Sequence, residues 1–247
     1  MPTNLVHPSF LLLSLVLGSC AVQIEAPEQP LDGIGLAPAR QDPRQIDDQA
    51  IAAAFQKREQ LKWPARLAVA RFGQTERGRG QSVTTLANVP TREQEIIDAR
   101  FEKGERWKPL VYLSPLVASE GSFSLLQMRL EAARAHADLL LVYGITTREG
   151  SAPNPLALLN VALLPAFVLP GSDLETLCVG GMALVDVRNG CVYALAGMDE
   201  RRGKSAPSAS KGGTYDALFH ETSHAVVAKL LDRVAAQVQV QEAQGTR

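Results

Sequence analysis

The stretch AARAHADLLLVYG, residues 132–144, contains the junction that decides the fold of this chain. Its first half closes an amphipathic pattern that predicts a helix over residues 122–137. Asp138 then leads into an unbroken apolar run at 139–143. A run of this kind is typical of a strand that is buried on both faces. The stretch therefore predicts a layered domain in which helices cover a sheet.

The segments before this junction alternate between strand and helix patterns. Residues 66–72 and 110–113 predict strands, and Thr91 is a natural cap for a helix that runs to about residue 105. Residues 73–90 contain the run RGRG and predict a long surface loop. This loop lacks the Gly-Lys-Ser/Thr ending of a phosphate-binding loop, so it indicates no nucleotide site.

The segments after the junction predict a hairpin and a last helix. Asn189-Gly190 is typical of the tip of a tight turn, and it predicts strands over 173–187 and 191–197. Residues 201–213 are rich in Lys, Ser and Gly and predict a flexible loop. A helix is expected over 214–238.

The resulting element order is β-α-β-α-β, an apolar insert, and then β-β-α. This order predicts a single layered α/β domain with a mixed β-sheet covered by helices, and an α+β arrangement is the variant. We expect the domain to occupy residues 49–240 and to end in a polar tail at 241–247. Residues 20–48, interrupted by four prolines and two glycines, predict a flexible tether in front of it.

The first twenty residues have the layout of a bacterial lipoprotein signal peptide. The apolar run Phe10–Leu17 is too short for a membrane span, which needs about 20 residues. It ends in Gly18-Ser19-Cys20, a small-residue cleavage site followed by the cysteine that receives the lipid. Residues 1–19 are therefore predicted to be the signal peptide and Cys20 the lipidation site. An ordinary secretory signal or a buried N-terminal helix is the alternative, because Met1–Pro8 contains no Lys or Arg.

Acyl chains on Cys20, such as palmitate, would hold the protein to a membrane, since each buried methylene contributes about 0.8 kcal/mol. The residue after Cys20 is Ala21 rather than Asp. By resemblance to known lipoprotein sorting, this implies the outer membrane, with the domain facing the periplasm. The membrane, reached through this lipid, is thus the first expected partner.

The charge balance argues against nucleic acid as a partner, and residues 155–170 indicate a different kind of contact. Lys and Arg number 25 against 26 Asp and Glu, a formal net charge of −1, so there is no basic excess for nucleic acid or for an anionic membrane surface. Residues 155–170 carry no charge and are interrupted by prolines. They predict either a buried segment or an apolar flap that meets lipid, a protein partner or a second copy of the chain.

Two further cysteines, Cys178 and Cys191, remain if Cys20 carries lipid. In the register that Asn189-Gly190 sets, Cys191 lies beside the turn and Cys178 lies far along the other strand. At about 3.4 Å per residue, the distance between the two sulfurs is beyond the reach of a disulfide. We therefore predict two free thiols.

Residues 220–224, His-Glu-Thr-Ser-His, fit the signature of zinc peptidases. Histidines four residues apart share one face of a helix and can bind the same Zn²⁺, with Glu221 as general base for a bound water. A catalytic zinc also needs a third protein ligand. Asp232 lies two turns further along the same helix, and Glu242 lies in the expected tail, so neither is placed to close the site.

The same helix also has an apolar stripe, which accounts for the packing of the helix without a metal. Its members are Phe219, Val226, Val227, Leu230, Val234 and Val238. The histidines fall at the flank of this stripe, and Glu221 falls on the polar side. We interpret the motif as accidental, with no catalytic residue, metal ligand or cofactor. The alternative is a membrane-tethered zinc metallopeptidase in which His220 and His224 bind zinc and Glu221 is catalytic; metal binding without catalysis is the third reading.

Four stretches resemble a known group of proteins. They are RLAVA at 66–70, the junction at 132–144, the apolar insert that ends in Leu169-Pro170-Gly171, and ALVDVRNGCVY at 183–193. Together they resemble small bacterial envelope lipoproteins of the rhombotarget type. More distantly, they are similar to the α/β domains of the curli-secretion lipoprotein and of the TolB N-terminal region. The resemblance implies a non-catalytic envelope lipoprotein and brings no catalytic residues. Together with the Cys20 signal and the tether, it leads us to expect a role in protein–protein interaction or assembly.

Overall fold

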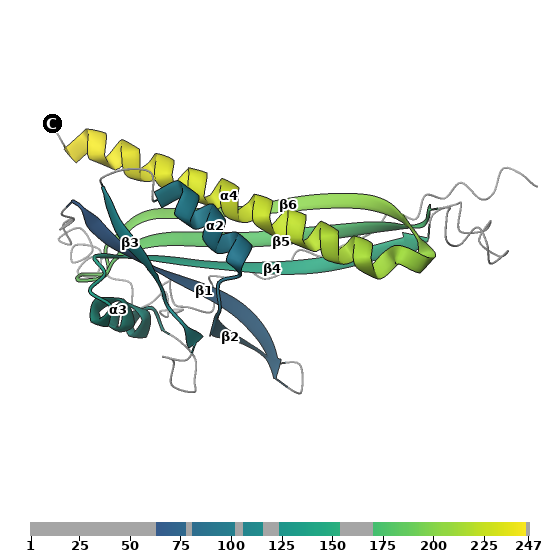
Figure 1. Ribbon diagram of the computed structural model, residues 1–247, viewed down its shortest axis with the longest axis horizontal. Coiled ribbons are helices and arrows are strands. Elements are labelled where there is room, and N and C mark those ends of the chain that lie inside the picture. The colour runs from purple at the N-terminus through teal and green to yellow at the C-terminus, as the bar shows by residue number, and fades with distance from the viewer. Residues whose placement is uncertain (1–62, 78–80, 102–105, 116–123, 154–169, 246–247) are drawn as a thin grey trace, which may run out of the picture.

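The computed structural model describes residues 63–77, 81–101, 106–115, 124–153 and 170–245. In these segments a six-stranded mixed sheet is covered by helices on both faces (Figure 1). The predicted layered α/β fold is thereby confirmed.

The strands are β1 (Ala65–Arg77), β2 (Gln81–Ala87), β3 (Trp107–Tyr112), β4 (Leu139–Pro153), β5 (Pro170–Asp186) and β6 (Val192–Pro207). The helices are α2 (Thr91–Phe101), α3 (Leu125–Arg134) and α4 (Lys211–Gly245), and the 3-10 turn η6 (Ser208–Ser210) directly precedes α4.

The sheet has the order β2-β1-β4-β5-β6, and β3 lies beside the first half of β1. β1 is parallel to β3 and β4 and antiparallel to β2, whereas β4, β5 and β6 form an antiparallel meander. Parallel neighbours need a crossover connection, and α2 and α3 provide the helices of these connections.

The core divides into two layers, one on each face of the sheet. In β1, Leu67 and Val69 pack on the face covered by α2 and α4, whereas Ala68 and Ala70 pack on the face of α3. Residues 139–143 of β4 are all fully buried. The prediction that this run is buried on both faces is therefore confirmed.

The domain is elongated because three strands and one helix extend beyond the rest (Figure 1). α4 has 35 residues, which corresponds to about 50 Å at 1.5 Å per residue. It lies along β5 and β6, on the same face as α2. We call the part of the meander farthest from the start of β1 the distal arm: residues 146–153 of β4, 172–179 of β5 and 199–207 of β6.

The β5–β6 hairpin has its turn at the predicted place. Gly190 has a φ of 73°, the left-handed region that favours glycine. Asp186 Oδ1 accepts a hydrogen bond from the backbone N–H of Arg188 at 2.8 Å, and Asn189 Oδ1 accepts one from that of Cys191 at 2.8 Å. The prediction from Asn189-Gly190 is confirmed.

Two segments predicted as loops are instead strands. The loop prediction for 73–90 is wrong: β1 continues to Arg77, and β2 pairs with it from Arg71↔Ala87 to Arg77↔Gln81. The flexible loop predicted for 201–213 is also wrong, because β6 pairs with β5 as far as Pro207. Both segments are polar, and long-range pairing rather than apolar patterning makes them strands.

Helix ends also differ from the predicted ones. α4 begins at Lys211 and continues to Gly245, so residues 241–245 are helix rather than tail. α3 begins after Ser124, whose hydroxyl accepts a hydrogen bond from the backbone N–H of Gln127 in a capping box. Among the described helices, none combines the length and the apolar character that a membrane-spanning helix needs.

Candidate functional site

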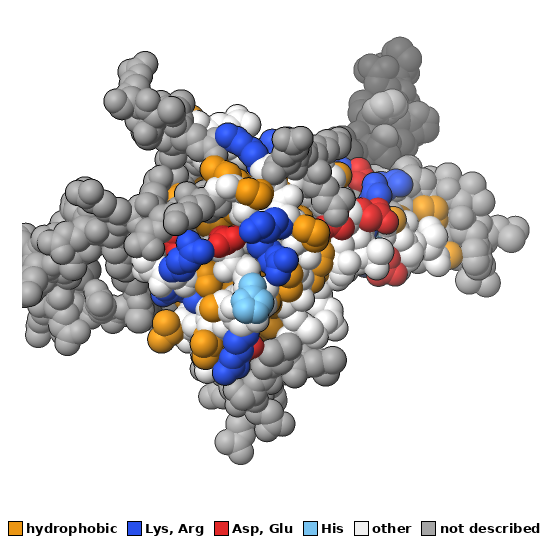
Figure 2. Space-filling model, turned by 60° about the vertical axis from the view of Figure 1, so that its left-hand side comes forward, with side chains coloured by type: hydrophobic (Ala, Val, Ile, Leu, Met, Phe, Trp, Pro, Cys, Tyr) orange, Lys and Arg blue, Asp and Glu red, His pale blue; other side chains and the backbone are white. Residues whose placement is uncertain are grey.

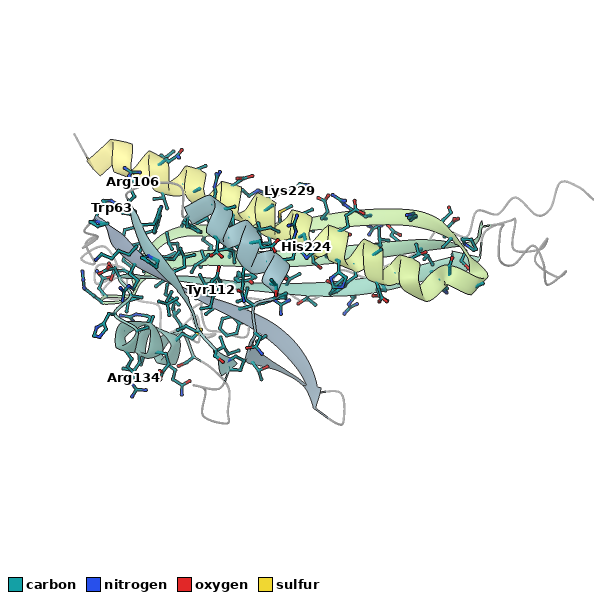
Figure 3. The ribbon with its side chains drawn as sticks, in the orientation of Figure 1. Trp63, Arg106, Tyr112, Arg134, His224 and Lys229 are labelled. Atoms are coloured by element: carbon teal, nitrogen blue, oxygen red, sulfur yellow. The ribbon has the colours of Figure 1, made fainter. Side chains whose placement is uncertain are left out.

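His220 and His224 lie side by side on α4, as their spacing predicts. Their rings stack with centroids 5.9 Å apart and an angle of 27° between the planes. His220 is exposed, whereas His224 is half-buried on the side of α4 that meets α2 (Figure 3). Burial lowers the pKa of His224, with smaller and opposing effects from Glu93, which raises it, and from His220 and Arg92, which lower it. The environment of His224 therefore favours the neutral ring.

The Glu221 carboxylate forms an ion pair with Arg202 of β6. Arg202 also lies 3.5 Å from Glu200, and Lys229 of α4 binds the same Glu200 carboxylate at 2.6 Å. The hydrogen bond from Lys229 lowers the pKa of Glu200, although partial burial opposes the shift. This alternating series of charges links α4 to β6, and Glu221 is part of it.

No third ligand joins the two histidines in the described part of the chain. Asp232 pairs with Arg100 of α2 at 3.0 Å. Within the described segments, no group of three His, Cys, Asp or Glu side chains could hold a metal ion. The described residues therefore supply two of the three protein ligands that a catalytic zinc needs.

A buried ionic cluster lies in the core between α2 and the sheet. Glu93, which is 2% exposed, accepts hydrogen bonds from Arg71 Nε at 2.9 Å and from the Tyr143 hydroxyl at 2.6 Å. Burial, together with the Glu93 charge, raises the pKa of Tyr143 far above its usual range. The phenol therefore stays protonated and donates to Glu93, which is an arrangement that holds α2 on the sheet.

The two described cysteines have free thiols. Cys178 is buried in β5 opposite Thr147 of β4, and Cys191 lies beside the β5–β6 turn. Burial raises the pKa of the Cys178 thiol, while hydrogen bonds with Thr147 and Ser223 lower it. A buried, protonated thiol is a poor nucleophile, so this cysteine has the character of a core residue.

An aromatic pocket that no sequence motif indicated lies where β1 and β3 begin. The rings of Trp63 and Trp107 meet edge to face at 5.0 Å, and Phe101 of α2 meets Trp107 at 4.9 Å. The Arg106 guanidinium lies 5.3 Å from the centre of the Trp63 ring (Figure 3). The pocket measures about 360 Å³ and is also lined by Arg100 and by the last turns of α4. We call it the Trp pocket.

A group of cations surrounds the same end of the sheet. We call it the basic end and define it by Arg66, Arg106, Lys108, Arg129, Arg134 and Arg188. Register and hydrogen bonds place its members together: Arg66 pairs with Lys108 across β1 and β3, and the backbone N–H of Ala65 donates to the Arg106 carbonyl.

The hairpin turn belongs to the basic end as well. Arg129 of α3 donates to the carbonyls of Val187 and Arg188 at 3.1 and 2.8 Å, and Arg188 binds Asp138 at 2.8 Å. Figure 2 shows Lys and Arg side chains interleaved with hydrophobic ones on this end of the molecule. The neutral overall composition thus hides a local concentration of positive charge.

Sequence reasoning missed the Trp pocket because residues from separate elements form it: the start of β1, α2, β3, β5 and α4. One signal was present: the chain has only two tryptophans, and each stands three residues before a predicted strand. The parallel pairing of β1 with β3 then brings Trp63 and Trp107 together. Of the other predicted sites, Cys20 and residues 155–169 lie outside the described residues.

Comparisons with known proteins find only distant structural similarity. No protein-family model matches the sequence, and no curated protein matches it either. A minor lipoprotein from Acinetobacter baumannii is similar in structure at 8% identity and a TM-score of 0.34, over 72% of this chain and 92% of that one. A lipoprotein from Neisseria meningitidis is similar at 16% identity and a TM-score of 0.32, over 65% and 99%.

A hypothetical protein from Chlamydia trachomatis is similar at 12% identity and a TM-score of 0.38, over 71% of this chain and 99% of that one. Two of these three solved structures are described as lipoproteins.

Proposed function

We propose that this protein is a lipoprotein of the bacterial envelope that acts by binding other proteins rather than by catalysis. Acyl chains on Cys20 would anchor it to the outer membrane, with the domain in the periplasm. The observation that carries the proposal is the order Leu17-Gly18-Ser19-Cys20 behind a short apolar run. The chain between Cys20 and Trp63 is long enough to let the domain move away from its anchor.

The geometry of α4 supports a role without catalysis. Glu221, which would have to act as a base, is paired with Arg202, and Asp232 is paired with Arg100. Thr222 and Ser223 of the motif are both buried. Their burial supports a role in the packing of α4. We infer that the protein needs no zinc or other cofactor.

Lipid labelling tests the anchor. Cells grown with an alkyne-bearing palmitate analogue should label the wild-type protein, and the Cys20→Ala variant should lose the label and accumulate with a larger mass. Cys191→Ala is the matched control, because it removes a partly exposed cysteine from the folded domain. An unlabelled wild-type protein would contradict the anchor.

Metal analysis tests the absence of zinc. The purified full chain should contain no stoichiometric zinc after growth with added zinc, and His224→Ala should not change its metal content. Stoichiometric zinc that is lost in His224→Ala would instead favour the peptidase reading of residues 220–224.

The segment at 155–170 stays the proposed contact with a partner protein or with a second copy of the chain. Its uncharged, apolar composition supports this proposal. Sedimentation should detect a complex or self-association of the wild-type chain, and Leu159→Glu should weaken it. Association that is equally strong in Leu159→Glu would exclude this segment as the contact.

A further inference from the structure

We propose that the basic end docks flat against anionic phospholipid headgroups of the membrane that holds the anchor, so that the distal arm projects away from the membrane. The proposal rests on the lipid anchor at Cys20. It adds an orientation and a second, protein-borne contact with the lipid surface.

The first observation is the exposure of charge at the basic end. Arg134 and Arg188 have side chains that are 65% and 51% exposed, whereas their partners Glu131 and Asp138 are 16% and 19% exposed. Arg106 and Lys108 are exposed as well. In these two ion pairs, the cation therefore extends further into solvent than the carboxylate that neutralises it.

The second observation is where apolar side chains reach the surface. Five large hydrophobic residues are exposed in the described segments, and they lie on α3, on the first residues of β6 and on the last turns of α4. They are Leu126, Leu130, Val192, Leu195 and Val240. These are the parts of the domain nearest the basic end, and none of the five lies on the distal arm.

The third observation is the position of both tryptophans. Trp63 and Trp107 are half-buried at the Trp pocket, beside Arg106. Tryptophan favours the interface between headgroups and acyl chains, because its ring is amphipathic. Basic residues with exposed leucines and interfacial tryptophans are the composition of a protein surface that lies on a membrane.

The path of the chain points to the same side. Trp63 is the first described residue, and it lies at the start of β1, at the basic end (Figure 3). The segment that leads to Cys20 therefore enters the domain at the basic end. Anchor and surface can thus engage one membrane together, and the tether adds a high local concentration.

The distal arm differs in charge. Its exposed side chains include both Glu149 and Asp199 and both Arg201 and Lys204. Such a mixed surface gains little from an anionic membrane. Because the sheet places it at the other end of the molecule, it is left accessible to a protein partner in the periplasm.

Tryptophan fluorescence tests the proposal, because both tryptophans lie at the docking surface. The full acylated chain is reconstituted in vesicles of phosphatidylethanolamine with phosphatidylglycerol, or of phosphatidylcholine alone. Lipids brominated near the headgroup serve as the quencher. We expect strong quenching in the anionic vesicles, weak quenching in the neutral ones, and a loss of the difference in high salt.

Charge reversal provides the matched comparison. Each basic residue near an anionic surface contributes about 1 kcal/mol, or about fivefold in partitioning. Arg188→Glu should therefore reduce docking at least about fivefold, and Arg134→Glu should act similarly. Arg188→Lys should retain docking. Arg201→Glu is the control on the distal arm, since Arg201 is also 51% exposed and paired with a half-buried carboxylate, and it should change nothing.

Failure of the docking and failure of the anchor give different results. Equal quenching in anionic and neutral vesicles, or equal effects of Arg188→Glu and Arg201→Glu, would overturn the docking surface even if Cys20 carries lipid. A missing lipid label would contradict the anchor. In that case, quenching of the unacylated Cys20→Ala chain by the same vesicles still decides whether the basic end binds them.

Discussion

Gln237 of α4 binds Leu195 of β6 in the way that a neighbouring strand would. Its side-chain oxygen accepts from the Leu195 backbone N–H at 2.9 Å, and its side-chain nitrogen donates to the Leu195 carbonyl at 2.9 Å. One turn earlier, Arg233 donates to the carbonyl of Gly197 at 2.6 Å. An open sheet edge can pair with other chains, and α4 therefore covers the first part of this edge with its own side chains.

Removal of this amide should weaken the packing of α4 on β6. Gln237→Ala is expected to lower the free energy of unfolding by about 1–2 kcal/mol, since two hydrogen bonds at an exposed site are lost. Urea titration measures the change. Gln239→Ala, the same substitution two residues further along α4, should have a smaller effect, and equal effects would show that the edge contact contributes nothing.

Gly180 allows α4 to approach β5 closely. A Cβ at this position would lie 2.5 Å from Val226 Cγ1 and 2.9 Å from Leu230 Cδ1. Gly180→Ala should therefore destabilise the domain by about 1–3 kcal/mol through overpacking.

Gly212 provides the opposite control for this substitution. No atom lies within 4 Å of a Cβ built there, and the residue lies in the first turn of α4. Gly212→Ala should leave stability unchanged or raise it by up to about 1 kcal/mol, because alanine favours helix. Thermal unfolding of the two variants compares them, and a Gly180→Ala protein as stable as wild type would contradict the close packing.

Removing one partner of the buried ion pair between Glu93 and Arg71 should strongly lower the free energy of unfolding. Glu93→Gln leaves the Arg71 charge without its carboxylate in a largely buried site, and we expect a loss of about 3 kcal/mol. Tyr143→Phe removes one hydrogen bond but keeps the ion pair, and it should cost less, about 1–2 kcal/mol. Denaturant titration orders the two variants, and the reverse order would contradict this description of the cluster.

Half-burial of His224 should make the stability depend on pH in weakly acidic solution. Its pKa in the folded protein is lowered by burial, against an unfolded value of about 6.5. Between these two values the unfolded chain binds more protons, so the free energy of unfolding falls as the pH drops below about 6.5.

Unfolding curves at several pH values test this dependence. His224→Gln should lose the part of the pH dependence that lies in this window. His220→Gln is the control and should keep most of it, because burial is the larger cause of the shift at His224. An unchanged pH profile in His224→Gln would show that other groups are responsible.

The parts of the fold that depend on local patterns could be predicted from the sequence. The apolar run at 139–143 and the Asn189-Gly190 turn both predict what the structure contains, since burial and backbone geometry are encoded within a few residues. β2 and the second half of β6 could not be predicted in this way. Their residues are polar, and only the partner strand, far away in the sequence or across a turn, makes them strands.

The candidate sites divide in the same way, into those that local spacing predicts and those that depend on long-range strand pairing. The helical spacing of His220 and His224 correctly places them together at the flank of the apolar stripe. Phe219, predicted for the stripe, is only half-buried, and its neighbour Leu218 takes the core position with Thr222. The Trp pocket and the basic end depend on which strands are neighbours, and a net charge of −1 gives no sign of where the charges gather.

The mass of the mature N-terminus tests the central claim most directly. Mass spectrometry of the protein isolated from membranes should find its first residue to be Cys20, carrying a thioether-linked diacylglycerol and an amide-linked acyl chain. A chain that begins at Ala21 or later, or that retains Met1–Ser19 without any acyl group, would contradict the assignment as a lipoprotein.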